Sequence, residues 1–326
     1  MQARLQGAAG RRGPGRTGAG KAAALALRAK PPAGLAPELA QALAQAQAAV
    51  QARPNDIPTL VAYAQAADRA GLREQAVAAY RRCLEINPHL HAIRHLVHAL
   101  SGEGMLPRAP DDYLRWVFDE AAPVFERELR ALKYQGPEMA LAAFHAVAGS
   151  DAPPQRIIDQ GCGTGLNAEV FARHIDLIDG IDVAARMLDQ ARARKVYDRL
   201  LLGEIAEVLD RSDRQYSLAL STDVLIYIGE IEPCFAATWR VLEPEGLFVV
   251  TVEMSDDEPV RLMPSGRYRQ SDAHIRAVAA RTGFRVEHAA FAPLRIERGQ
   301  EEPGGAYALR KVARDGPPAA NGGAAS

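Results

Sequence analysis

Three glycines at alternate positions follow a short apolar run, and their spacing is the clearest sign of chemistry in this chain. The run 156–166 reads R-I-I-D-Q-G-C-G-T-G-L, with Asp159 before Gly161, Gly163 and Gly165. Glycine turns the chain sharply and lets a ligand approach the main-chain N–H donors that open the next helix. The pattern predicts a strand, a backbone cradle and a nucleotide-like ligand.

The spacing of the third glycine narrows the type of ligand. A dinucleotide fingerprint would place it at Leu166, three residues after Gly163, whereas this chain has Gly165. Asp182 ends a second predicted strand, 177–183, about 20 residues after the first glycine, where an acid accepts hydrogen bonds from ribose hydroxyls. A carboxylate there disfavours a phosphorylated ribose. The alternative is a purely structural strand-to-helix turn.

Strands and helices alternate on both sides of these residues. Such alternation implies right-handed crossovers and a mainly parallel sheet that binds ligands at the carboxyl ends of its strands. A later helix, 272–282, has Ser271 as its predicted N-cap and Gly283 after it. The other predicted helices are 167–174, 184–196 and 233–242, and the other predicted strands are 199–202, 216–221, 247–253, 285–297 and 306–312.

Four motifs in this order resemble those of class I S-adenosylmethionine-dependent methyltransferases. They are D-Q-G-C-G-T-G from Asp159, G-I-D-V-A-A-R-M-L from Gly180, L-G-E-I from Leu202 and S-T-D-V-L-I-Y-I-G from Ser221. The resemblance covers residues 111–312. It implies a Rossmann-like, mainly parallel seven-stranded sheet with helices on both faces, closed by a hairpin whose last strand is inserted antiparallel.

The resemblance also implies a cofactor, S-adenosyl-L-methionine, and a set of residues around it. Asp159, Gly161 and Gly163 would face the methionine portion and Asp182 the ribose. Val183 and Met187 would lie near the adenine, with Glu204 and Ile205 against it, although members of the family usually have Asp in place of Glu204. The full set predicted to bind the cofactor is Asp159, Gly161, Cys162, Gly163, Gly165, Asp182, Val183, Met187, Glu204, Ile205, Thr222 and Tyr134.

An aromatic segment precedes the first strand of this region. Its sequences V-F-D-E-A-A-P-V-F-E and L-K-Y-Q-G-P look like the leading helices that cover the cofactor in many such enzymes. On that resemblance Phe118, Asp119, Phe125 and Tyr134 are further candidates. The alternative is that this aromatic stripe only packs in the core.

Methyl transfer from a sulfonium is a direct displacement and requires no side-chain nucleophile. The protein must hold the reacting atoms in line in a dry site, and a base helps only those acceptors that must lose a proton. The polar candidates near the acceptor are Asp223, Tyr227, Tyr268 and His274, each of which also suits a hydrogen-bonding or packing role. The predicted acceptor is a small molecule or a protein group. The alternative function is a non-catalytic scaffold that binds the cofactor and docks a partner.

The region before the methyltransferase-like part is helical and rich in alanine. Pro54 and Pro88 stand one 34-residue period apart, and the segment between them resembles a tetratricopeptide repeat flanked by partial ones. The repeat could dock a protein partner or act as a packing appendage. His91, His95 and His98 share one helical face; we expect a solvated face rather than a zinc site, because no fourth ligand of the usual type is near.

The predicted organisation has four parts: a disordered basic leader (1–35), a tetratricopeptide-like segment (36–105), a methyltransferase domain (106–313) and a disordered tail (314–326). Within the leader, G-R-T-G-A-G-K resembles the front of a phosphate-binding loop. It ends in Ala22, where Ser or Thr would hold magnesium, and no strand precedes it. We therefore expect no nucleotide site there.

Composition places further bounds on function. The 326 residues are 48% hydrophobic with a net charge of -1, which gives no overall attraction to nucleic acid. No stretch approaches the roughly 18 uninterrupted apolar residues of a membrane span. Cys83, Cys162 and Cys234 lack metal-site spacing and are predicted to be small apolar fillers in a reducing, cytoplasmic setting. A nicotinamide oxidoreductase is disfavoured by the glycine spacing.

Overall fold

The computed structural model describes residues 34–313, which divide into two compact units. The helical unit contains residues up to Val117 together with Arg261–Tyr268. The sheet unit contains Phe118–Val260 and the residues from Arg269 onward. The units therefore divide at Val117, whereas composition placed the change at residue 105. The predicted leader and tail lie almost wholly outside the described residues.

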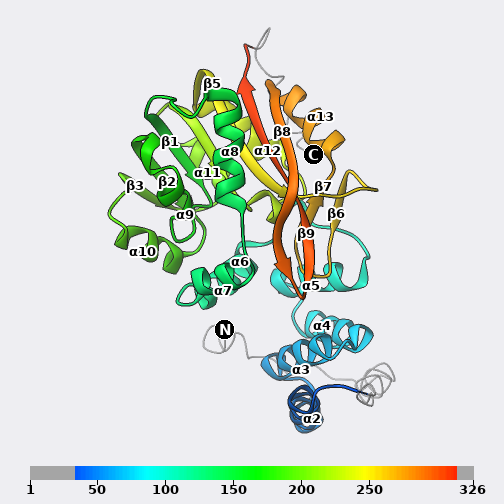
Figure 1. Cartoon of the computed structure of the whole chain (residues 1–326). Coiled ribbons are helices and arrows are strands. Elements are labelled where there is room, and N and C mark those ends of the chain that lie inside the picture. Colours follow the sequence, from blue (N-terminus) through cyan, green and yellow to red (C-terminus); the bar gives the residue numbers. More distant parts are fainter. Residues whose placement is uncertain (1–33, 314–326) are drawn as a thin grey trace. The chain divides into compact units, whose positions relative to one another are not determined.

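The helical unit consists of successive helices, most of which are joined by short loops (Figure 1). Asp56 opens the second helix by accepting a hydrogen bond from Thr59 N at 3.1 Å. Its helices are α2 (Pro37–Ala52), α3 (Ile57–Arg69), α4 (Arg73–Ile86), α5 (His91–Ser101) and the first part of α6 (Asp111–Ala121). The positions expected to face inward in the repeat are all buried, namely Leu60, Tyr63, Ala64, Ala76, Tyr80 and Cys83. The repeat itself stays a prediction.

The three histidines of α5 do not form the solvated face that their spacing predicted. His95 is fully buried, and its Nε2 lies 2.9 Å from Gly266 O. Because a carbonyl only accepts, this nitrogen carries the proton. The expectation was wrong because the segment Arg261–Tyr268 covers that side of the helix, with the Tyr268 ring 5.9 Å from the His95 ring. Within residues 34–313 no group of three or more His, Cys, Asp or Glu side chains could hold a metal.

The sheet unit contains a seven-stranded sheet in the order β3-β2-β1-β4-β5-β9-β8. Strands β1 to β5 run parallel, and β9 lies antiparallel between β5 and β8, as the resemblance implied. The strands are β1 (Gln155–Gln160), β2 (Ile175–Asp182), β3 (Arg199–Leu202), β4 (Tyr216–Ser221), β5 (Leu242–Glu253), β8 (Phe284–Glu297) and β9 (Gln300–Lys311). The predicted α/β Rossmann-like fold is confirmed.

Helices cover both faces of this sheet (Figure 1). Neighbouring side chains of a strand point to opposite faces: Ile157 packs in the cluster with Phe144 of α8, and Ile158 in the cluster with Phe235 of α12. The helices are α7 (Phe125–Ala131), α8 (Gly136–Ala148), α9 (Leu166–Val170), η2 (Ala172–His174), α10 (Ala185–Ala193), α11 (Ile205–Asp210), η3 (Leu225–Tyr227), α12 (Glu232–Val241) and α13 (Asp272–Thr282). None of the helices in the described range is long and apolar enough to cross a membrane.

Two local predictions had different outcomes. Ser271 caps α13 as expected, because its hydroxyl accepts from His274 N at 3.2 Å, and Gly283 ends that helix with φ 85. The strand predicted over 247–253 begins earlier, because β5 starts at Leu242 and includes Glu243–Gly246. Glu245 has φ 63, and the pairing of β5 with β4 shifts register there, so this part of the strand is a bulge.

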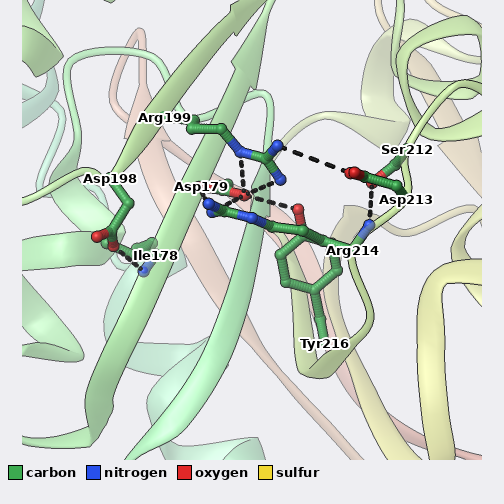
Figure 2. A network of polar contacts seen from close by, with 8 residues as sticks. All are labelled: Ile178, Asp179, Asp198, Arg199, Ser212, Asp213, Arg214 and Tyr216. Atoms are coloured by element: carbon green, nitrogen blue, oxygen red, sulfur yellow. Dashed lines mark hydrogen bonds and ion pairs between the residues drawn. The ribbon is translucent and has the colours of Figure 1, made fainter.

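A carboxylate inside the sheet ties β2 to β3 and to the start of β4 (Figure 2). Asp179 is fully buried and accepts hydrogen bonds from Arg199 Nη2 at 2.9 Å, Arg214 Nη1 at 2.8 Å and the Tyr216 hydroxyl at 2.8 Å. Sequence patterning did not predict this network, since its donors come from two later segments of the chain. It stabilises the strand whose last residue is Asp182.

Candidate functional site

The glycine loop after β1 has the backbone that its sequence predicted. Gly161 has φ 65, and a Cβ there would lie 2.3 Å from a methyl group of Val224. Gly165 has φ 91 and begins α9, and a Cβ there would lie 2.8 Å from Arg194 Cδ. Both positions therefore require glycine for conformation and for space. At Gly163 the corresponding position is open, with Phe125 at 3.9 Å.

Asp159 stabilises this loop through side-chain hydrogen bonds. It is fully buried, and its two carboxylate oxygens accept from the Tyr197 hydroxyl and from Asn167 Nδ2, each at 2.7 Å. Burial raises the pKa of Asp159 to about 6, and these two hydrogen bonds oppose the shift. Asn167 and Tyr197 were missed at the sequence level. A polar residue at the second position of the helix that follows the loop was the signal for Asn167.

Asp182 joins the end of β2 to the same loop. One carboxylate oxygen accepts from Gly163 N at 2.9 Å and the other from Ala184 N at 2.8 Å. Burial raises the pKa of Asp182 to about 6 as well. The predicted ribose-binding acid and the glycine cradle thus meet at the carboxyl ends of adjacent strands, as ligand sites do in this type of sheet.

The residues predicted near the adenine lie at the ends of β2 and β3. Met187 is buried beside Ala122 and Ala184, and Ile205 is buried in the main core. Glu204 caps α11 by accepting from Glu207 N at 3.0 Å, so one of its oxygens already has a partner. Leu202, which sequence reasoning did not select, ends β3 with 60% of its surface exposed. An exposed leucine at a strand end offers apolar surface to a ring.

The cysteines behave as fillers. All three are buried and free of disulfides. Cys162 lies inside the glycine loop, and its backbone N–H donates to Ile181 O at 2.9 Å. Burial raises the pKa of the Cys162 thiol well above its usual value, so this thiol is protonated and unreactive at neutral pH. Its contribution to the loop is the backbone and a small apolar side chain.

Arg194 connects the glycine loop to the leading helices. Its guanidinium donates to Thr164 O at 2.6 Å, to Glu169 Oε2 at 2.9 Å and to Glu126 Oε1 at 2.6 Å. A second link joins Asp119 Oδ1 to Arg186 N at 3.0 Å. The segment that carries Phe118 and Phe125 is therefore held over the loop by two polar connections, as the acid-aromatic pattern of that segment suggested.

A second group of candidates follows β4. The Thr222 hydroxyl is hydrogen-bonded to Asn167 Nδ2 of the loop, and Asp223, with φ 57, accepts from Arg295 Nη1 at 2.6 Å. The Tyr227 ring packs edge-to-face on Phe118 at 5.3 Å. Tyr134 belongs to the same group, because the charges of Asp223 and Arg295 both act on its pKa, which burial raises. The structure thus brings Tyr134, Thr222, Asp223 and Tyr227 to one edge of the loop.

Two further acceptor-side candidates have local contacts. Tyr268 is fully buried in the helical unit, and its hydroxyl donates to Leu106 O at 2.9 Å. His274 lies in the first turn of α13, where burial lowers its pKa. Their part in binding an acceptor stays a prediction.

The residues around the loop fit the cofactor that the motifs implied. Thr164 Oγ1 and Asn167 Oδ1 are buried and have no hydrogen-bond partner among the described residues. Buried polar atoms normally have partners, so these atoms suit a polar ligand. Asp182 and Leu202 add an acceptor for hydroxyls and an apolar surface. An amino acid, a ribose and a base together match this set.

Comparison with known proteins agrees with this geometry. Residues 158–250 match the family model described as a methyltransferase domain. This segment is similar to the methyltransferase domains of that family. The match runs from β1, through the glycine loop and Asp182, to β5.

Curated methyltransferases match part of this chain. The malonyl-[acyl-carrier protein] O-methyltransferase of Serratia marcescens is 26% identical over 44% of this chain and 55% of its own length. The human methyltransferase-like protein 27 is 30% identical over 50% of this chain and 64% of its own length. The match thus spans only about half to two thirds of the length of these relatives.

Two solved structures share the fold. The Burkholderia thailandensis 1,6-didemethyltoxoflavin-N1-methyltransferase, solved with S-adenosylhomocysteine, has a TM-score of 0.52 and 18% identity, covering 64% of this chain and 93% of its own. The [4+2]-cyclase SpnF has a TM-score of 0.50 and 17% identity, covering 64% and 99%. Together the comparisons support an S-adenosylmethionine-dependent methyltransferase, and they do not identify the methyl acceptor.

Proposed function

We propose that this chain transfers the methyl group of S-adenosylmethionine to a small-molecule or protein acceptor at the carboxyl ends of β1, β2 and β4. The observation that carries the proposal is the 2.9 Å hydrogen bond from Gly163 N to Asp182 Oδ2, which brings the glycine cradle and the ribose-type acid together. The methyl donor supplies an electrophilic methyl group on a positively charged sulfur.

Each part of the methyltransferase domain has a proposed role in holding the donor. Asp182 accepts from the ribose hydroxyls, and the N–H groups of the glycine loop, with Thr164 and Asn167, bind the methionine portion. Val183, Met187, Glu204 and Ile205 surround the adenine together with Leu202. The segment that carries Phe118 and Phe125 excludes water, which strengthens every polar interaction beneath it. Asp223, Tyr227 and Tyr134 lie on the acceptor side.

The helical unit has a proposed role of its own. Its buried inner positions support a tetratricopeptide-like packing, and we assign it the docking of a protein partner. A cytoplasmic location belongs to the same proposal and follows from the cysteine usage in the sequence. A pull-down that recovers the same partner with the full chain and with a surface-charge variant of α2 would argue against docking through this helix.

Turnover must be tested directly, because one fold supports several chemistries and the cyclase shares this one. The full chain is incubated with S-adenosylmethionine and a panel of amines, phenols and carboxylic acids, and S-adenosylhomocysteine is quantified. We expect turnover with at least one class and a loss of at least about 100-fold in Asp182→Ala. Asp189→Ala, an exposed acid on α10, is the matched control and should keep the activity.

The two outcomes of that assay separate the two functions considered. Release of S-adenosylhomocysteine that depends on an acceptor supports the methyltransferase. Binding of S-adenosylmethionine without turnover across the whole panel supports the scaffold that only binds the cofactor. Equal turnover by wild type and Asp182→Ala would contradict the proposed site.

A further inference from the structure

A chain of ion pairs leads from the surface to the edge of the glycine loop. Glu302 pairs with Arg269 at 2.7 Å, and Arg269 Nε lies 3.8 Å from Glu253 Oε2. Glu253 also pairs with Arg295, and Arg295 pairs with Asp223 at 2.6 Å. Arg295 Nε also lies 3.6 Å from Glu297 Oε2. The groups joined in this way are four carboxylates and two guanidinium groups, which together carry two more negative charges than positive charges.

Asp223 is the end of this ion-pair chain that meets the cofactor cradle. Its neighbour Thr222 is hydrogen-bonded to Asn167, and its other neighbour, Val224, lies against Gly161. The Glu253 and Arg295 side chains are 1% and 4% exposed, whereas that of Asp223 is 15% exposed. Charges in such a poorly hydrated place interact more strongly than they do at the surface. The acceptor side therefore presents a carboxylate.

Aromatic residues lie on the segments next to this carboxylate. Tyr227 ends the short helix η3 that follows Asp223, and its half-buried ring packs edge-to-face on Phe118 at 5.3 Å. Burial raises the pKa of Tyr134, and the charge of Asp223 raises it further. The faces of aromatic rings attract cations, and a carboxylate among them adds to that attraction. Rings and carboxylate favour the same kind of ligand.

The backbone fixes the positions of these groups. Gln135 N donates to Leu294 O at 2.9 Å, and Ile296 N donates to Leu132 O at 2.7 Å. These two hydrogen bonds flank Arg295 on β8 and Tyr134 on the linker between α7 and α8. The backbone that carries Arg295, whose guanidinium orients Asp223, is thus hydrogen-bonded to the backbone that carries Tyr134.

From this arrangement we infer that the group methylated is an amine nitrogen, that Asp223 binds it, and that Arg295 is a positioning residue for Asp223. The inference rests on the proposed methyltransferase function and specifies its acceptor class. A neutral amine gains positive charge as it attacks, and a fixed carboxylate with aromatic faces stabilises that charge. A carboxylate acceptor would be repelled by the same groups.

The step balances as follows. An ammonium group bound at Asp223 loses one proton to water and becomes a neutral amine, while Asp223 stays ionised. The nitrogen lone pair would then form the new N–C bond while the C–S bond of the donor breaks and leaves its electron pair on sulfur. The positive charge of the sulfonium would thereby pass to the methylated nitrogen, beside the Asp223 carboxylate.

The test measures binding of a matched pair of probes to the full chain saturated with S-adenosylhomocysteine. The probes are 4-fluorobenzylammonium and 4-fluorobenzoate, followed by fluorine NMR titration at pH 7.5. We expect the ammonium to bind at least about tenfold more tightly than the benzoate. Asp223→Asn should weaken the ammonium about tenfold and leave the benzoate unaffected or tighter. Asp213→Asn, an exposed acid on the far side of Arg199, is the control and should change neither.

Several results would overturn the inference. Equal or tighter binding of the benzoate, binding of neither probe, or an unchanged ammonium affinity in Asp223→Asn would each do so. If Asp223→Asn does not fold, Tyr227→Leu is measured instead and should weaken the ammonium at least about threefold. The affinity for S-adenosylhomocysteine is measured alongside. If the wild type does not bind S-adenosylhomocysteine, the proposed function is contradicted. If it binds S-adenosylhomocysteine but the probe test fails, only the amine assignment is contradicted.

Discussion

The Arg194 guanidinium donates to Glu126 Oε1 at 2.6 Å and joins α7 to the segment that follows α10. The same guanidinium holds Thr164 O of the glycine loop at 2.6 Å. Because both ends of this link lie over the proposed cofactor site, it should slow the release of ligand. Glu126 ends the leading-helix sequence V-F-D-E-A-A-P-V-F-E, whereas no motif of the sequence marked Arg194.

Glu126→Gln should therefore increase the rate at which S-adenosylhomocysteine dissociates, by about fivefold. The pair is partly exposed and contributes on the order of 1 kcal/mol, where 1.4 kcal/mol corresponds to tenfold. Stopped-flow displacement measures the rate. Asp189→Asn, which removes the exposed ion pair with Arg192, is the control and should leave it unchanged. An unaltered rate in Glu126→Gln would show that α7 does not retain the ligand.

The part of the site that sequence could predict is the part made by consecutive residues. The glycine loop follows the end of one predicted strand and Asp182 ends the next, so both could be located from the strand pattern. The spacing of the glycines then indicated the type of ligand. Arg295 could not be found in this way, since it lies 72 residues from Asp223 and belongs to β8, the strand at the far edge of the sheet. His95 shows a different limit of sequence prediction. Its helix face was predicted to be solvated because it is polar, but a segment far along the chain, which includes Gly266, covers it.

The buried acids near the loop predict a pH dependence of cofactor binding. Burial raises the pKa of both Asp159 and Asp182 to about 6. Since the folded chain then holds these protons more tightly than the unfolded chain, the two acids add stability as pH falls from about 6 toward about 4. Protonated Asp182 is a weaker acceptor for hydroxyls, so the dissociation constant of S-adenosylhomocysteine should rise over the same window. Carboxyl carbon NMR checks the titration, and values near 4 would refute it.

His95 predicts a stability change of the opposite sign. Burial lowers its pKa, so the unfolded chain takes up a proton that the folded chain does not, and stability is lost as pH falls below about 6.5. Replacing it by alanine should cost about 3 kcal/mol through the lost packing and hydrogen bond. His95→Gln should reduce the slope of unfolding free energy against pH. Some slope remains, because the pKa values of His145 and His274 are also lowered. A slope equal to that of the wild type would contradict this role.

Asp179 should be the most sensitive acid of the sheet (Figure 2). Asp179→Asn leaves two guanidinium groups without their buried partner and should cost about 3 to 5 kcal/mol in urea unfolding. Asp213 also pairs with Arg199, at 3.8 Å, but its side chain is 89% exposed. Asp213→Asn should therefore change the unfolding free energy by less than about 0.5 kcal/mol. Similar losses in the two variants would mean that burial does not set the strength of this network.

The central claim is that S-adenosylmethionine binds where Asp182 meets the glycine loop. Isothermal titration of S-adenosylhomocysteine into the full-length wild type, Asp182→Ala and Asp189→Ala at pH 7.5 tests it most directly. The account predicts binding by the wild type and by Asp189→Ala with similar dissociation constants, and at least about tenfold weaker binding by Asp182→Ala, with all three proteins folded by circular dichroism. Equal affinity of Asp182→Ala and the wild type, or no binding by the wild type, would contradict it.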